Sequence, residues 1–182
     1  MQLFQLRNYN VIFEPVTMSI TAFAKIRDKN KDDNLTLKEM SFLWFFTDPR
    51  SDFQNIIDEE ERKDEIKKAI SLPEDWEPDK IVIDAIKFYR EFAKTPSSGL
   101  YEASMTVAQF IERKLKKPEA LLAEEDAKGN PLYKLDSLLR LTKDVPDVMI
   151  KLAAAKEQVI QELEAKAELK GGKTKALFED GI

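Results

Sequence analysis

Apolar residues recur at helical spacing along most of the chain. In the segment 79–94, the apolar residues Val82, Ile86 and Tyr89 fall on one stripe, which Phe92 and Ala93 extend. This pattern predicts an amphipathic helix with one buried face.

A second long repeat runs from Pro146 to Lys170, with apolar residues at spacings of three and four. Its positions are Val148, Leu152, Ala155, Val159, Leu163 and Ala167. At 1.5 Å per residue this helix has a length of about 37 Å. Its narrow stripe predicts packing against one neighbour or along a bundle seam.

Further helices are expected where apolar periodicity lies between turn-forming residues. The expected segments are 15–27, 36–46, 58–68, 97–117 and 132–141, with residues 118–131 irregular or forming a single turn. In the segment 97–117 we expect the apolar residues to point inward, namely Leu100, Val107, Ala108, Ile111 and Leu115. A short connection predicts that this helix forms a hairpin with the helix over 79–94. The fold class is therefore all-α, an irregular bundle of about six to seven helices.

The helix over 36–46 differs from the others because it is apolar on every side. Thr36 and Glu39 have the spacing of a capping box at its start. Residues 40–46 (MSFLWFF) then follow with almost no polar positions. Such a helix is buried on all faces, in its own core or against neighbouring subunits.

Both ends of the chain lack helical periodicity. Residues 3–13 (LFQLRNYNVIF) predict an extended arm or an edge strand, and residues 171–182 (GGKTKALFEDGI) predict an extended tail that acts as an interaction element. The expected organisation is an N-terminal arm over 1–14, a helical domain over 15–170 and a C-terminal tail over 171–182.

Composition and charge narrow the possible partners. The chain has 182 residues, of which 43% are hydrophobic and 35% charged, with a net charge of −5. Without a basic excess, we expect no direct contact with nucleic acid. Its longest aromatic-rich run, 40–46, is far shorter than the roughly 20 residues that span a bilayer, so we expect no membrane insertion.

The chain contains no histidine and no cysteine, which excludes several common types of catalytic site. Their absence excludes a Ser-His-Asp triad, a Cys-His pair and an ordinary zinc site. The phosphate-binding patterns GxxxxGK[ST] and GxGxxG are also absent. A glycosidase that uses only carboxylates remains formally possible, but the acidic residues lie on charge-rich helical faces. We therefore expect no enzyme activity, no catalytic residues and no cofactor.

One segment, 28–39, has the spacing of an EF-hand calcium loop. Its candidate oxygen ligands are Asp28, Asn30, Asp32, Asn34 and Glu39. Against this interpretation, Asp33 occupies the position where the loop needs glycine, and no second loop is present to pair with it. We expect no metal there, and a calcium-binding EF-hand-like module is the alternative function.

Three stretches together carry a resemblance to a known group. They are RDKNKDD at 27–33, FLWFFTDPRSDF at 42–53 and DEEERKDEI at 58–66, followed by helices and a tail that contains Gly171 and Gly172. In this order they resemble small structural proteins of crAss-like and related tailed bacteriophages, which help to form the rings between portal and tail.

The resemblance implies a virion protein that is assembled in the host cytoplasm. It implies a homo-oligomeric, head-tail connector ring of about twelve copies that contacts the portal or neighbouring neck and tail proteins. The resemblance assigns no catalytic or ligand-binding role to any residue of this chain. A cytoplasmic scaffold of another kind is a further alternative.

Overall fold

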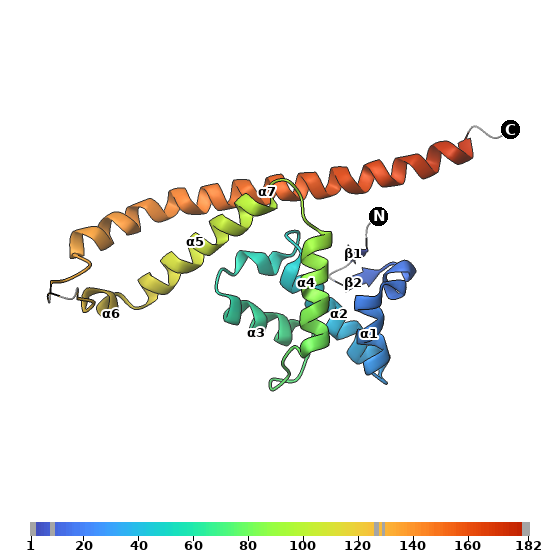
Figure 1. The fold of residues 1–182 in the computed structure, drawn as a ribbon, viewed down its shortest axis with the longest axis horizontal. Coiled ribbons are helices and arrows are strands. Elements are labelled where there is room, and N and C mark those ends of the chain that lie inside the picture. Colours follow the sequence, from blue (N-terminus) through green and yellow to red (C-terminus); the bar gives the residue numbers. More distant parts are fainter. Residues whose placement is uncertain (1–2, 8–9, 126–127, 129, 180–182) are drawn as a thin grey trace. The chain divides into compact units, whose positions relative to one another are not determined.

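The computed structural model describes residues 3–7, 10–125, 128 and 130–179 (Figure 1). Helix accounts for 71% of the chain, which confirms the all-α class. The elements are β1 (Phe4–Arg7), β2 (Asn10–Phe13), the 3-10 helix η1 (Pro15–Ser19), α1 (Thr21–Lys29), α2 (Asp33–Thr47), the 3-10 helix η2 (Asp52–Asn55), α3 (Glu59–Ala69), α4 (Lys80–Phe92), α5 (Ser98–Lys116), α6 (Pro118–Leu122) and α7 (Leu135–Glu179).

The chain divides into two compact units. Unit 1 comprises Met1–Thr95 together with Ile160–Ile182, and unit 2 comprises Pro96–Val159. Helix α7 therefore contributes to both units, and α4 and α5 belong to different units. This division differs from the expected single helical domain over 15–170.

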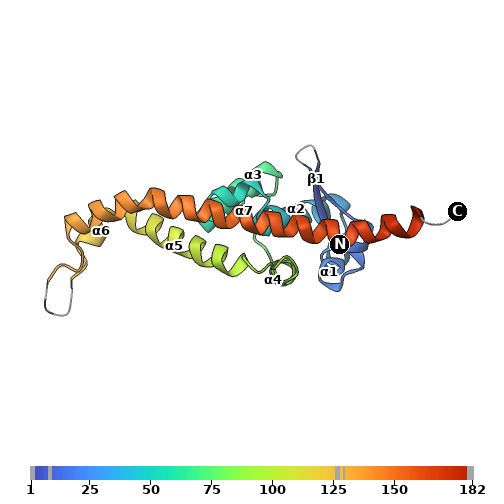
Figure 2. The same ribbon diagram turned by 90° about the horizontal axis from the view of Figure 1, so that it is seen from above.

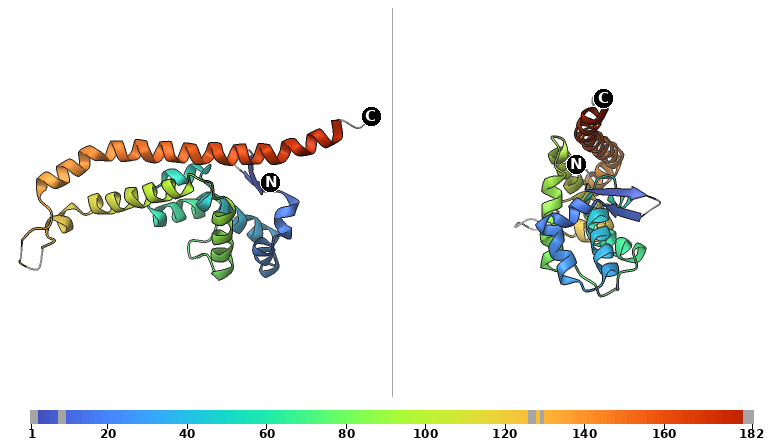
Figure 3. Two further views of the ribbon diagram at one scale, coloured as in Figure 1. Left: turned by 45° about the horizontal axis from the view of Figure 1, so that its top comes forward. Right: turned by 90° about the vertical axis from the view of Figure 1, so that its right-hand side faces the viewer.

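The first residues form a hairpin that belongs to the core of unit 1. Strands β1 and β2 form an antiparallel pair (Figure 3). In its register Phe4 lies opposite Phe13. The Phe4 ring is fully buried and meets the rings of Phe23 and Tyr89 edge-on, at centroid distances of 5.6 and 5.1 Å. The segment is extended, as predicted, but it folds back on itself and packs into the core instead of projecting as an arm.

Helix α2 is the centre of unit 1, with α1 and α4 packed against it (Figure 1). Met40, Phe42, Leu43 and Trp44 are each at most 2% exposed. This confirms the prediction that the aromatic helix is buried, and its buried neighbours lie within the same unit. The predicted start at Thr36 is wrong, because Asp32 accepts a hydrogen bond from the backbone N–H of Asn34 and caps the helix earlier.

Unit 2 is built around a helical hairpin. Helix α5 runs beside the first half of α7 (Figures 1 and 2). Both helices have buried apolar residues: Tyr101, Met105, Ala108, Ile111, Leu152, Ala155 and Val159. Leu100 and Val107 are 61% and 50% exposed, so the prediction that they point inward is wrong.

Helix α7 extends across two positions where the sequence predicts a boundary. The predicted helix start at Pro146 is wrong, since the proline lies inside the helix. Positions 141, 145, 148, 152, 155 and 159 form one inward stripe across it, so packing on both sides compensates for the missing N–H. An extended tail from 171 is also wrong as far as Glu179, because α7 continues to that residue. Its two glycines each cost only about 1 kcal/mol, and good helix formers follow them.

The burial of α2 predicts large effects on stability. Trp44→Ala and Phe42→Ala should each lower the free energy of unfolding by about 3–5 kcal/mol, since each leaves a cavity in the core. Leu37→Ala on the exposed side of the same helix should change it by no more than about 0.5 kcal/mol. Urea unfolding followed by circular dichroism measures all three. Losses below about 1 kcal/mol for both aromatic changes would contradict the described packing.

Candidate functional site

The candidate calcium ligands do not surround a common point. Helix α1 ends at Lys29 and α2 begins at Asp33, so only residues 30–32 lie between the two helices. A calcium loop of the EF-hand type needs about 12 residues of irregular chain. Asp28 pairs with its neighbour Arg27, and Asn34 is already in the first turn of α2. Within the described part of the chain, no three acidic side chains gather where they could hold a metal ion.

Glu39, the predicted bidentate ligand, has a different role. Its carboxylate is 3% exposed and accepts hydrogen bonds from Lys29 Nζ at 2.9 Å, Asn30 Nδ2 at 2.7 Å and Trp76 Nε1 at 3.3 Å. Lys29 Nζ also binds Asp79 Oδ2 at 2.7 Å. The lysine ammonium thus supplies the positive charge that this carboxylate needs, and it ties the end of α1 to α2 and to the start of α4.

Asp79 is the N-cap of α4, and its carboxylate accepts from the backbone N–H of Val82 at 2.9 Å. Burial alone raises the pKa of Asp79, but the hydrogen bonds from Lys29 and from Val82 lower it overall. The carboxylate therefore stays charged and serves two structural purposes, capping α4 and holding Lys29.

A second buried charge lies at the opposite end of α2. Asp48 is fully buried and binds Arg50 through Nε at 2.8 Å and Nη2 at 2.7 Å. The Tyr89 hydroxyl of α4 donates to Asp48 Oδ2 at 2.5 Å. Burial and the adjacent Asp48 raise the pKa of Tyr89 well above its usual value, so the phenol remains a donor. All three groups are satisfied by one another, which indicates a structural rather than a catalytic cluster.

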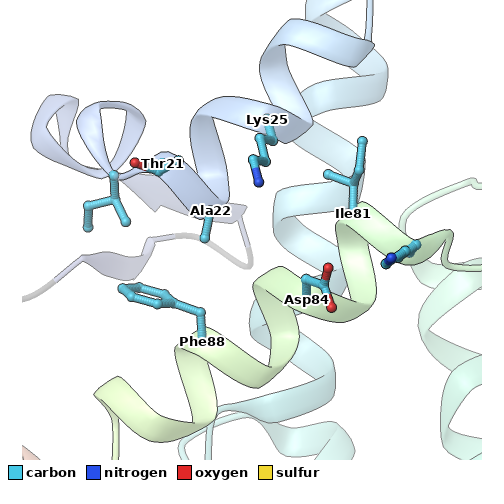
Figure 4. A pocket seen from close by; sticks show the side chains of 8 residues that line it. Thr21, Ala22, Lys25, Ile81, Asp84 and Phe88 are labelled. Carbon is cyan, nitrogen blue, oxygen red and sulfur yellow. The ribbon is translucent and has the colours of Figure 1, made fainter.

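A pocket opens between α1 and α4 in unit 1, with a volume of about 580 Å³. Its wall is partly apolar, formed by residues that include Ile20, Ala22, Ile81 and Phe88. In Figure 4, Lys25 extends from α1 toward α4, while Asp84 and Ile81 project from α4. Pockets of about 300–1,000 Å³ with apolar walls and a few charged groups are typical binding sites.

Unit 2 exposes large apolar side chains on both of its long helices. On α7 these are Leu135, Leu139, Met149 and Ile150, with exposed fractions of 62%, 54%, 38% and 66%. We call these four residues the outer stripe. Helix α5 adds Leu100, Val107 and Phe110. Sequence analysis missed the outer stripe because it placed a helix boundary at Pro146, which divides these residues between two helices.

No protein-family description, curated protein or solved structure matches the chain. Among the described residues, no helix is both long and apolar enough to cross a membrane.

The environment of Glu39 predicts a large loss of stability on neutralisation. Glu39→Gln should lower the free energy of unfolding by about 1–3 kcal/mol, because the buried amide cannot accept all the hydrogen bonds that the carboxylate accepts, and the Lys29 ammonium keeps only Asp79 as a charged partner. Lys31→Gln, on the exposed turn nearby, should leave the stability nearly unchanged. Urea unfolding of both variants tests this, and equal small effects would show that the Lys29–Glu39 pair contributes little.

The same geometry predicts that calcium does not bind at micromolar concentration. A calcium ion at Glu39 would have to displace Lys29 and unwind the first turn of α2. Calorimetric titration of Ca²⁺ into the protein should give no binding heat in that range, for the natural chain and for Glu39→Gln alike. A micromolar site that Glu39→Gln abolishes would support the calcium-module alternative.

Proposed function

We propose that the chain is a non-enzymatic structural protein that acts through protein-protein interfaces, as a subunit of an oligomeric ring at the head-tail junction of a tailed bacteriophage. The observation that carries its interface function is the outer stripe of α7. The phage assignment is supported by the sequence resemblance in residues 27–66.

The outer stripe is a second apolar face on a helix that already has one. At about 100° per residue, its positions centre about 130° around α7 from the inward stripe that packs in unit 2. Leu135, Leu139 and Ile150 each leave more than half of the side chain in water. Burying one such side chain fully contributes about 1.5–3 kcal/mol. A partner that covers the stripe therefore gains several of these contributions.

A two-helix layer also leaves its own outer surfaces uncovered. Each long helix of unit 2 can bury one face against the other, but Leu100, Val107 and Phe110 on α5 remain exposed together with the outer stripe. Apolar residues that recur at helical spacing on an uncovered face are typical of helix-helix interfaces. Further copies of the chain are suitable partners, and a closed ring of identical subunits requires head-to-tail contacts of this kind.

The alternatives receive less support. A calcium-responsive module needs free oxygen ligands, and Glu39 already binds Lys29, Asn30 and Trp76. A scaffold that does not enter the particle would use the same apolar surfaces, so the presence of the chain in finished particles separates that function from the proposed one.

The proposed assembly predicts that the molecular mass of the protein in solution increases with its concentration. Light scattering of the purified chain, alone and with the phage portal protein, should show species larger than the 21.0 kDa monomer. Leu139→Asp with Ile150→Asp should weaken this association at least about tenfold, because each change places a charge in the interface. Leu37→Asp, an exposed position of unit 1, serves as the matched control and should leave the mass unchanged. A natural chain that stays monomeric under all these conditions would contradict the proposal.

A further inference from the structure

Helix α5 has a second apolar face, as α7 does. Its buried, inward residues in unit 2 are Tyr101, Met105, Ala108 and Ile111. At about 100° per residue, the exposed residues Leu100, Val107 and Phe110 centre about 120° around the helix from that inward face. Their exposed fractions are 61%, 50% and 54%, and the exposed Ala103 lies on the same face. We call these four exposed residues the α5 stripe: Leu100, Ala103, Val107 and Phe110.

The α5 stripe and the outer stripe lie on opposite faces of the two-helix layer. Viewed along each chain from its N-terminal end, the outer stripe lies clockwise of the inward residues of α7, whereas the α5 stripe lies counterclockwise of those of α5. The two helices form an antiparallel hairpin (Figures 1 and 2), so one of these senses reverses when both are viewed from the same end. Because the inward residues of the two helices face each other, rotation in the same sense leads to opposite sides of the layer.

The two stripes also share one spacing. Positions of the α5 stripe follow one another at intervals of three, four and three residues, and the exposed positions 139, 142, 146 and 149 of α7 repeat these intervals. Alternating intervals of three and four form a straight seam, along which two helices pack side by side. The α5 stripe extends over about 15 Å and the outer stripe over about 22 Å, so the outer stripe is long enough to cover the α5 stripe completely.

We propose that subunits stack head-to-tail through unit 2, with the α5 stripe of one copy packed against the outer stripe of the next. A single kind of contact then covers both apolar faces of every subunit, whereas contacts between identical faces would need two different kinds. Because the stripes lie on opposite faces, the contact repeats from copy to copy and closes into a ring when the rotation between neighbours divides a full turn. The inference rests on the proposed assembly and names the two surfaces that form its contact.

Blocking one stripe at a time distinguishes this contact from a contact between identical faces. Val107→Asp with Phe110→Asp blocks the α5 stripe, and Leu139→Asp with Ile150→Asp blocks the outer stripe. Each variant is a full chain that retains one intact stripe. All four positions are exposed, so each variant should keep the helical content of the natural chain, which circular dichroism checks.

Sedimentation of each blocked variant alone should show the 21.0 kDa monomer at a concentration where the natural chain associates, with association at least about tenfold weaker. An equimolar mixture of the two should form a species of twice that mass, because the intact outer stripe of one variant packs against the intact α5 stripe of the other. Leu37→Asp with Lys31→Gln makes the same change in net charge at exposed positions of unit 1. This matched control should associate as the natural chain does.

Several results would overturn the inference and leave the proposed assembly in place. Dimers of either blocked variant alone would show a contact between identical stripes. A mixture that stays monomeric, or blocked variants that associate as strongly as the natural chain, would place the contact elsewhere. A natural chain that associates only with the portal protein would also exclude stacking between copies.

Glutamine at the same four positions gives a second set of variants, because it removes apolar surface without adding charge and is a good helix former. These variants should repeat the pattern, with two monomers that form a dimer when mixed. A natural chain that stays monomeric both alone and with the portal protein would count against both proposals.

Discussion

Unit 1 is organised by the need to bury a helix that is apolar around its whole circumference. No single neighbour can cover α2, because a helix contact buries only one face. The structure meets this requirement with α1, α3 and α4, and with the hairpin, whose Phe4 ring completes the core. The first residues of the chain are therefore part of the fold, although their sequence alone left open an extended arm or an edge strand.

A buried charged group lies near each end of α2, and each must be paired with an opposite charge within the core. Glu39 near the start and Asp48 after the end are both buried carboxylates, and each has a cation beside it, Lys29 in one case and Arg50 in the other. Because removing one partner of such a pair costs more than the pair contributes, both clusters constrain which residues are tolerated. The segments 27–33 and 42–53 contain Lys29, Asp48 and Arg50. The charged residues of these segments therefore have structural roles within unit 1.

The sequence predicted what depends on local patterns. The starts of α3 and α4 and the burial of Met40–Trp44 follow from periodicity and from good N-cap residues at Asp58 and Asp79. It did not predict what depends on distant partners. The candidate calcium loop was proposed from oxygen spacing alone, whereas the role of Glu39 depends on Trp76 and on the Lys29 that bridges it to Asp79. Likewise, Pro146 predicts a helix boundary, and only packing on both sides of it shows why α7 continues.

The two units differ in how completely they bury their own apolar side chains. Unit 1 surrounds its aromatic helix, and none of its exposed large apolar residues is more than 44% exposed: Leu6, Ile12, Val16, Leu37, Ile83 and Phe88. Unit 2 has two long helices, each with one face packed and further apolar residues in water. We expect such a chain to associate through unit 2, because that unit leaves more apolar surface exposed. In the proposed assembly, the outer stripe supplies free energy of association, whereas charged groups around such a contact select which partner binds and in which direction.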